Sequence, residues 1–164
     1  MGMFFRRGTT GVRWVPTIVD ITSPTAAEIT AGVDLGPALA SMEGFETQLN
    51  RINQALLKYK QEVQIDGPQQ FGDAKITLIE DDGTGATGDD LARKTIYTAL
   101  VEQATGFIVI NPTAQTFLAA AKCEVWPARI GSKNRSFSLD AEPARYVVEL
   151  AISGAQEKNA VVGA

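Results

Sequence analysis

The sequence predicts a mainly β protein of the α+β class, an antiparallel sandwich or barrel with one flanking α-helix and an extended N-terminal arm. About six to eight segments show the apolar alternation or β-rich composition of strands. Only one long segment, 89–105, has a clear helical period, and strands lie on both sides of it. The 164 residues suit a single domain (1–164) with a core of its own.

Residues 1–20 are predicted to form the N-terminal arm. They contain Phe4 and Phe5, a flexible Gly-Thr-Thr-Gly run, and a strand-like segment around Trp14. Terminal segments stay disordered unless something holds them, and these apolar side chains are too large for a free tail. They pack either on their own domain or on a neighbouring subunit, and the sequence leaves both alternatives open.

A short helix is expected after the arm. Ser23 can cap it, Pro24 suits a first turn, Glu28 favours the N-terminal end and Gly32 ends it.

Residues 43–80 are expected to hold strands and a long loop. Residues 43–52 resemble a strand, whereas 51–63 fit either a helix or a strand. Turns are predicted at Gly67-Pro68 and at Gly72-Asp73. A clear strand follows over 74–79.

The helix over 89–105 is capped by Asp89 or Asp90, and Gly106 is its expected C′ residue. Its apolar stripe consists of Ile96, Tyr97, Leu100, Val101 and Ala104. A buried strand is predicted immediately afterwards, over 107–110.

The region 106–153 is predicted to be β. In 117–125 and in 145–152 apolar residues alternate with polar ones, which indicates strands with one buried face. A turn is expected at 132–135, and Trp126-Pro127 suggests a bulge or a sheet edge. The tail, 154–164, shows no strong pattern.

Composition excludes several kinds of chemistry. The chain has no histidine and one cysteine, so Ser-His-Asp and Cys-His catalysis, HExxH zinc sites and internal disulfides are ruled out. Cys123 lies on the apolar side of its predicted strand and is expected to be a buried hydrophobe. A net charge of -4 argues against dedicated nucleic-acid binding. Catalysis by a pair of carboxylates stays open on composition alone, because 19 acidic side chains are available, but no spacing singles out a pair.

No targeting or membrane segment is predicted. The N-terminal charge order does not fit a secretory signal, and Arg6 stands where a myristoylation signal needs Ser or Thr. The uncharged stretch 103–121 contains too many polar residues for a lipid-facing helix. The chain is expected to fold in a cytoplasm.

The segment Gly83-Thr-Gly85-Ala-Thr-Gly88 fits a GxGxxG fingerprint between a strand and a helix. Five carboxylates flank it, however, where a pyrophosphate needs a neutral or positive cradle. The same loop, 80–90, could hold a hard cation, although its spacing does not match an EF-hand. A solvated acidic loop explains it best, so no cofactor or metal is expected.

The order of these features resembles one family. The run "AAAKCEVWPARIGSKNRSFSLDAEPARYVVELAISGAQEKNAVV" is similar to the C-terminal β region of major tail tube proteins (major tail proteins) from long, non-contractile-tailed bacteriophages. The runs "GFETQLNRIN", "EVQIDGPQQF", "AKITLIEDDG" and "GFIVI" fit its middle. The opening "VRWVPTIVDITSPTAAEITAGVDL" resembles its arm and short helix. The resemblance covers about 12–162 of the chain.

The resemblance implies a structural subunit of the tail tube type, without enzyme activity. Six copies would form a ring, rings would stack into a tube, and DNA would cross the lumen during ejection without specific binding. Other partners would be the tape measure, tail terminator and baseplate proteins. The protein would be made in the host cytoplasm and located in the virion tail. Alternatives are a ring protein of the same fold (tail terminator, baseplate or secretion-system tube component) or a small calcium- or ligand-binding module built on loop 80–90.

Candidate residues follow from this role. An inter-ring loop would lie within 43–80. The expected subunit-interface residues are Phe4, Phe5, Trp14, Tyr59 and Phe71. The expected lumen-facing residues are Lys122, Glu124, Arg145 and Glu149, because they lie on the polar sides of two predicted strands.

Overall fold

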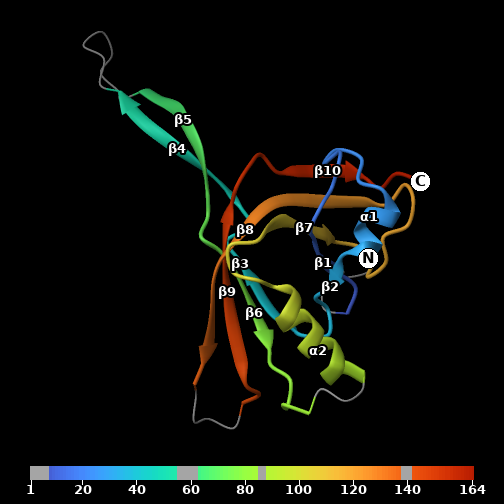
Figure 1. The fold of residues 1–164 in the computed structure, drawn as a ribbon. Coiled ribbons are helices and arrows are strands. Elements are labelled where there is room, and N and C mark those ends of the chain that lie inside the picture. Colours follow the sequence, from blue (N-terminus) through green and yellow to red (C-terminus); the bar gives the residue numbers. More distant parts are fainter. Residues whose placement is uncertain (1–7, 55–62, 85–87, 138–141) are drawn as a thin grey trace, which may run out of the picture.

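The computed structural model describes residues 8–54, 63–84, 88–137 and 142–164, which form a β-rich body and one projecting hairpin (Figure 1). The elements in chain order are β1 (Gly11–Val15), α1 (Ala26–Ala31), β2 (Val33–Asp34), β3 (Leu39–Glu43), β4 (Thr47–Gln54), β5 (Val63–Phe71), β6 (Ala74–Ile79), α2 (Gly88–Ala99), β7 (Thr105–Asn111), β8 (Lys122–Ser136), β9 (Arg145–Ile152) and β10 (Glu157–Val161). The predicted mainly antiparallel β fold is confirmed.

The body is one eight-stranded sheet in the order β2-β1-β7-β8-β9-β6-β3, with β10 also pairing with β8. All of its strand pairs are antiparallel. The first half of β8 lies between β7 and β10, and its second half pairs with β9. The register shifts between Ile130 and Ser132, so an extra residue, Gly131, changes which side chains point to each face.

Two clusters of buried side chains hold the body together. The larger core contains Val12, Trp14, Leu35, Ala38, Ala74, Ile76, Leu78, Ile96, Leu100, Ile108, Ile110, Trp126, Ala128, Ile130, Tyr146, Val148 and Leu150. The smaller core contains Val15, Ile18, Ile29, Val109, Phe117, Cys123, Val125, Ala160 and Val162. Ile96 of α2 and Leu100, which directly follows α2, pack in the larger core. Ile29 of α1 packs in the smaller core. Neighbouring residues of β1, β7 and β8 therefore face different cores.

The N-terminal segment is shorter as an arm than predicted. Strand β1 lies inside the sheet between β2 and β7, so residues 11–15 of the expected 1–20 arm belong to the body. The indole of Trp14 is 3% exposed, and a Cβ on Gly106 would lie 2.7 Å from it. That close contact explains why a glycine is needed in β7. Residues 1–7 lie outside the described part of the chain.

Helix α1 is capped by Thr25, and not by Ser23 as predicted. The Glu28 amide donates to the Thr25 hydroxyl, and the Thr25 amide donates to the Glu28 carboxylate at 2.8 Å. This reciprocal pair is a capping box, which satisfies two N-terminal amides together. Gly32 is the C-cap, as expected.

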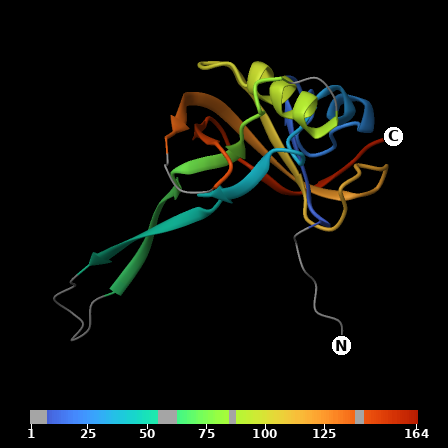
Figure 2. The same cartoon turned by 90° about the horizontal axis from the view of Figure 1, so that it is seen from below.

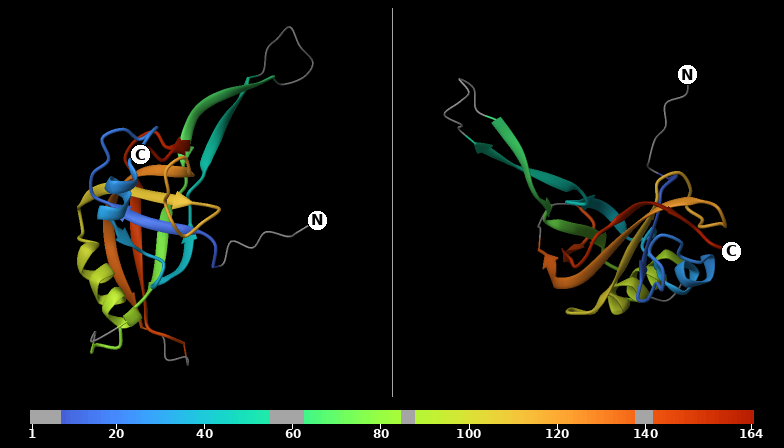
Figure 3. Two further views of the ribbon diagram at one scale, coloured as in Figure 1. Left: turned by 90° about the vertical axis from the view of Figure 1, so that its right-hand side faces the viewer. Right: turned by 90° about the horizontal axis from the view of Figure 1, so that it is seen from above.

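Strands β4 and β5 pair with each other in a separate two-stranded sheet that extends well away from the body (Figures 2 and 3). The turn predicted at Gly67-Pro68 is wrong, because both residues lie inside β5. The register shifts between Leu49 and Arg51, so they occupy a bulge, where proline is tolerated in a strand. The ambiguous segment 51–63 is a strand at both ends, and its residues 55–62 lie outside the described part.

Helix α2 ends at Ala99, six residues before the predicted end at 105. Leu100 still donates to the Ile96 carbonyl, but Gln103 has a φ of 68°, which breaks the helical path. Gly106 lies in β7 and is not a helix C′ residue. Asp89 and Asp90 lie in the first turn of the helix, which begins at Gly88.

Three predictions in the C-terminal third need correction. Residues 117–121 form a turn with Ala120 at a φ of 65°, so the strand begins only at Lys122. The expected turn at 132–135 is paired strand, because β8 continues past its bulge to Ser136. The tail contains β10, which pairs with β8. On one side of β8, Pro127 lies where the partner strand changes from β9 to β10. On the other side, β7 pairs with Pro127 without a register shift, so the bulge suggested at Trp126-Pro127 does not occur there.

Candidate assembly surfaces

One face of β3, β6, β9 and the end of β8 is polar and turned away from the larger core. We call it the polar face; it comprises Ser41, Glu43, Lys75, Thr77, Ile79, Ser132, Asn134, Ser136, Arg145, Val147 and Glu149. In the register, Glu43 lies opposite Lys75, Lys75 opposite Glu149, and Glu149 opposite Ser132. Directly opposite residues share a face of a sheet. The polar face is therefore continuous across four neighbouring strands.

Short polar contacts connect this row. The Lys75 ammonium lies 3.0 Å from the Glu43 carboxylate, and the Ser132 hydroxyl donates to the Glu149 carboxylate at 2.9 Å. Lys75 and Glu43 are both about half-exposed, so their ion pair adds little stability. The polar face is therefore a solvent-accessible surface that carries both positive and negative side chains.

The predicted lumen-facing residues divide between two faces. Arg145 and Glu149 lie on the polar face. Glu124 lies on the opposite one, because it pairs with Ile110, and Ile110 pairs with Val12 in the larger core. Lys122 has the same alternation as Glu124 and is exposed beside β10. The bulge at Gly131 causes this division, and a period-2 pattern read from sequence cannot reveal it.

Local contacts fix two of these four side chains. The Glu124 carboxylate accepts a hydrogen bond from the Trp126 indole at 3.2 Å. Arg145 lies 3.4 Å from the Glu142 carboxylate, and its Nε is buried without a hydrogen-bond partner in the described residues.

The predicted interface residues also have different fates. Trp14 is buried in its own subunit, so its assignment to the interface is wrong. Phe71 is half-buried and packs edge-on against Trp126, with ring centroids 6.5 Å apart. Phe4, Phe5 and Tyr59 lie outside the described residues.

The hairpin of β4 and β5 carries exposed apolar side chains that the sequence pattern did not single out. Leu49 is 44% exposed and Ile52 is 49% exposed. Two-stranded hairpins are at best marginally stable in water, so such a hairpin gains from contact with another surface. Its exposed leucine and isoleucine provide apolar area for that contact.

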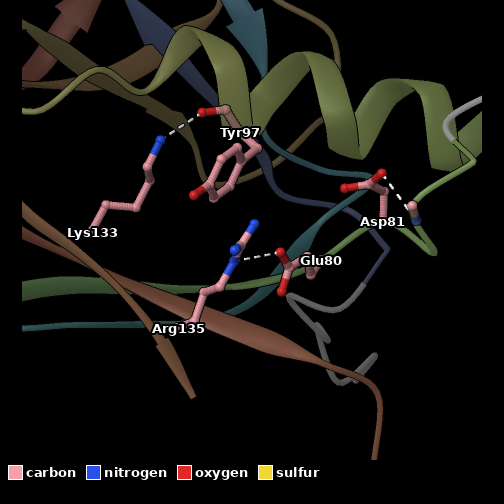
Figure 4. A network of polar contacts seen from close by, with 6 residues as sticks. Glu80, Asp81, Tyr97, Lys133 and Arg135 are labelled. Carbon is pink, nitrogen blue, oxygen red and sulfur yellow. Dashed lines mark hydrogen bonds and ion pairs between the residues drawn. The ribbon is translucent and has the colours of Figure 1, made fainter. Parts of the chain in front are cut away.

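The acidic loop satisfies its own backbone in the described residues. The Asp90 carboxylate accepts from the Asp82 amide at 2.9 Å, and Asp82 accepts from the Thr84 amide and hydroxyl. Asp81 accepts from Gly83 (Figure 4). Among the described residues no group of three possible metal ligands is found. Gly85 to Thr87 of the GxGxxG segment lie outside them.

A polar network beside this loop joins α2 to β8 (Figure 4). The Lys133 ammonium lies 3.7 Å from the centre of the Tyr97 ring and donates to the carbonyls of Tyr97 and Leu100. These carbonyls belong to the open end of α2, so Lys133 acts as its C-terminal cap. Arg135 lies 2.7 Å from the Glu80 carboxylate. The sequence prediction of a turn at 132–135 missed this cap. Lys133 and Arg135 point to the same side of the sheet, toward α2, only because the segment is a strand.

Cys123 is buried in the smaller core, as predicted. Burial, and secondarily the nearby Glu124 carboxylate, raise the pKa of its thiol to about 11. The thiolate is therefore scarce at neutral pH, which makes the residue a poor nucleophile.

No helix among the described residues is both long and apolar enough to span a bilayer.

The fold is similar to that of a chain in the cryo-EM structure of the anti-feeding prophage (AFP) baseplate, six-fold symmetrised. The TM-score is 0.54 and the sequence identity is 10%, over 96% of this chain and 97% of that one. No curated protein sequence matches the chain. The sequence profile of the phage tail tube proteins matches residues 2–164. The chain therefore belongs to the phage tail tube protein family and is a structural component of a phage tail.

Proposed function

We propose that this protein is the major tube subunit of a long, non-contractile phage tail. Six copies form a ring, and the rings stack into a hollow tube through which DNA passes into the host. The observation that carries this proposal is the polar face, a wetted surface that crosses four strands of a body otherwise built around apolar cores. Such a surface suits the wall of a water-filled channel.

The charges of the polar face fit a conduit for DNA. Glu43 and Glu149 alternate with Lys75 and Arg145, so neither sign dominates. Strong DNA binding requires several uncompensated cations, because each neutralised phosphate adds to affinity. A mixed face would instead let the duplex slide. Local balance supports the proposal better than the net charge of -4, because the four charged side chains of the polar face sum to zero.

The β4–β5 hairpin is proposed to connect successive rings. It leaves the body as a separate two-stranded sheet, and its Leu49 and Ile52 side chains are about half-exposed.

Six copies per ring are proposed on the family resemblance and on the six-fold symmetry of the similar baseplate structure. The tape measure, tail terminator and baseplate proteins would be partners. The subunit would be made in the host cytoplasm, and no membrane is involved.

A second candidate is a ring at the end of the tail. The similarity to a chain of a baseplate structure supports it. The two candidates predict different products, because a tube subunit must stack on copies of itself indefinitely, whereas a baseplate ring stops after one or a few layers.

Negative-stain electron microscopy of the purified chain at high concentration tests the proposal. We expect hollow tubes of uniform diameter. Single rings would favour the baseplate candidate, and a protein that stays monomeric at every concentration would contradict both. Leu49→Asp should shorten the tubes or leave single rings, because it places a charge in the proposed inter-ring contact. The control, Gln48→Asp, adds the same charge to the hairpin without removing an apolar side chain.

A further inference from the structure

The two chains that connect the β4–β5 hairpin to the body meet the same side chain. Phe45 lies between β3 and β4, and Phe71 is the last residue of β5. Both rings pack edge-to-face with the Trp126 indole of β8, at centroid distances of 5.6 Å and 6.5 Å. Such packing is directional, because the positive edge of one ring meets the negative face of the other. The hairpin is therefore joined to the body by two oriented contacts, one on each of its chains.

Trp126 is held in place independently of the hairpin. Its side chain is fully buried, and the indole N–H donates to the Glu124 carboxylate at 3.2 Å. Its backbone lies inside the sheet, opposite Ile108 of β7. The indole cannot turn without breaking these contacts. A change in the direction of the hairpin would therefore have to move Phe45 and Phe71 away from a ring that stays where it is.

Two hydrogen bonds also hold the base of the hairpin. Gln156, in the connection between β9 and β10, donates from its side-chain amide to the Thr47 hydroxyl at 2.7 Å. The Gly72 amide donates to the Glu46 carbonyl at 3.1 Å, which ties the two chains together where they leave the body. A single attachment would let the hairpin swing about it. Attachments to β8 and to the β9–β10 connection resist rotation in more than one direction.

We infer that Phe45 and Phe71 are positioning residues that set the direction of the hairpin in the free subunit, before any neighbour binds. The inference rests on the proposed function, in which Leu49 and Ile52 of this hairpin contact the next ring. A hairpin that already points in its bound direction loses less conformational entropy on assembly, which favours binding. The exposed side chains provide the apolar area, and the aromatic base directs it.

Distance measurements by electron paramagnetic resonance test the direction of the hairpin in the unassembled full chain. Nitroxide labels are attached to Arg51→Cys on β4 and Lys94→Cys on α2, both at exposed positions. Cys123 is buried and stays unlabelled. We expect one narrow distribution of distances between the two labels. A broad distribution in this otherwise wild-type chain would show a swinging hairpin and would overturn the inference.

Substitutions at the base of the hairpin identify the residues that set its direction. Phe71→Ala should at least double the width of the distance distribution. Phe117→Ala is the matched control, because it removes the same ring from the smaller core and should lower stability without changing the width. Thr47→Val keeps every ring, removes the hydroxyl that Gln156 binds, and should broaden the distribution less; it is the second variant if Phe71→Ala does not fold. An unchanged width in the folded variants, or equal broadening by Phe117→Ala, would contradict the inference.

Assembly kinetics show whether the direction of the hairpin matters to the tube. Phe71→Ala should assemble about tenfold more slowly than Phe117→Ala, followed by light scattering, because fewer free subunits hold the hairpin in the binding direction. Equal rates for the two variants would overturn the positioning role. A wild-type chain that forms no tubes or rings would refute the proposed function alone, since the distances in the free subunit decide the direction of the hairpin without assembly.

Discussion

The body and the β4–β5 hairpin are built from the same kind of strand but are stabilised differently. Strands of the body bury side chains in one or both cores, and residues such as Trp126 and Tyr146 are fully inaccessible to solvent. The hairpin strands pair only with each other, and Leu49 and Ile52 remain about half-exposed. Burial therefore holds the body, whereas backbone pairing alone holds most of the hairpin.

This difference separates folding from assembly. Apolar burial is the largest favourable contribution to folding, so the stability of the subunit should reside in the body. The hairpin contributes little to that stability and can keep apolar side chains available for a partner. A subunit organised this way folds before it assembles. Substitutions in the two regions should therefore affect folding and assembly independently.

The largest expected difference is between Trp126→Ala and Ile52→Ala. The Trp126 ring packs edge-on against Phe45, with centroids 5.6 Å apart, and is completely buried. Its removal should lower the free energy of unfolding by about 3–5 kcal/mol. Ile52→Ala should change it by no more than about 0.5 kcal/mol. Urea denaturation of the unassembled subunit measures both, and equal losses would show that the hairpin is part of the folding unit.

Gly44→Ala tests the junction between the two regions. Gly44 connects β3 to β4 at a φ of 77°, and a Cβ there would lie 2.1 Å from the Asp73 carbonyl oxygen. The strained backbone and the clash should together cost about 1–3 kcal/mol. Gly83→Ala is the control, because Gly83 also has a positive φ but open space around it. A smaller loss for Gly44→Ala than for the control would show that the junction moves freely.

Sequence reasoning predicts the fold class and most strands of the body, because their side chains alternate between water and a core. Residues 74–79 and 145–152 are strands with the predicted bounds. Its failures occur where a partner from a distant part of the chain decides the local structure. Gly67-Pro68 has the composition of a turn, yet β4 pairs around it as a bulge.

The candidate surfaces are harder to predict than the fold. Lys122 and Glu124 alternate like Arg145 and Glu149, so a period-2 pattern places all of them on polar faces. Only the register shift near Gly131 shows that they belong to opposite sides of the sheet. Similarly, Trp14 has the size and position of an interface anchor, but its environment depends on β7, about ninety residues later in the chain.

A smaller effect is expected from Lys133→Met. This change keeps the aliphatic stem but removes the donor to the carbonyls of Tyr97 and Leu100 and the cation over the Tyr97 ring. Burial lowers the pKa of Lys133, which shows that holding the charge there has a cost, so the net loss should be only about 1 kcal/mol. Lys158→Met is the control: Lys158 is exposed and lies 5.7 Å from the Trp126 ring. If both variants lose the same stability in thermal unfolding, the cap of α2 is unimportant.

The smallest expected effect is a dependence on pH at α1, the shortest helix of the body. Hydrogen bonds to the Glu28 carboxylate, first from the Thr25 amide and then from the Val19 amide and the Thr25 hydroxyl, lower the pKa of Glu28 below its ordinary value of 4.5. As the pH falls below that value, the unfolded chain takes up a proton before the folded one does. The contribution of this carboxylate to stability is therefore fully present above pH 4.5 and is lost as the pH falls through the folded-state pKa.

Glu28→Gln should remove this part of the acid dependence, seen as a shallower fall in the urea midpoint between about pH 5 and pH 3. Glu157→Gln is the matched control, because the Glu157 carboxylate accepts one local amide hydrogen bond, from Asn159, and no capping box depends on it. The same slope in both variants would contradict the assignment. A shallower slope for Glu28→Gln with unchanged assembly at neutral pH would show that α1 contributes to folding and not to assembly, as the contrast between body and hairpin predicts.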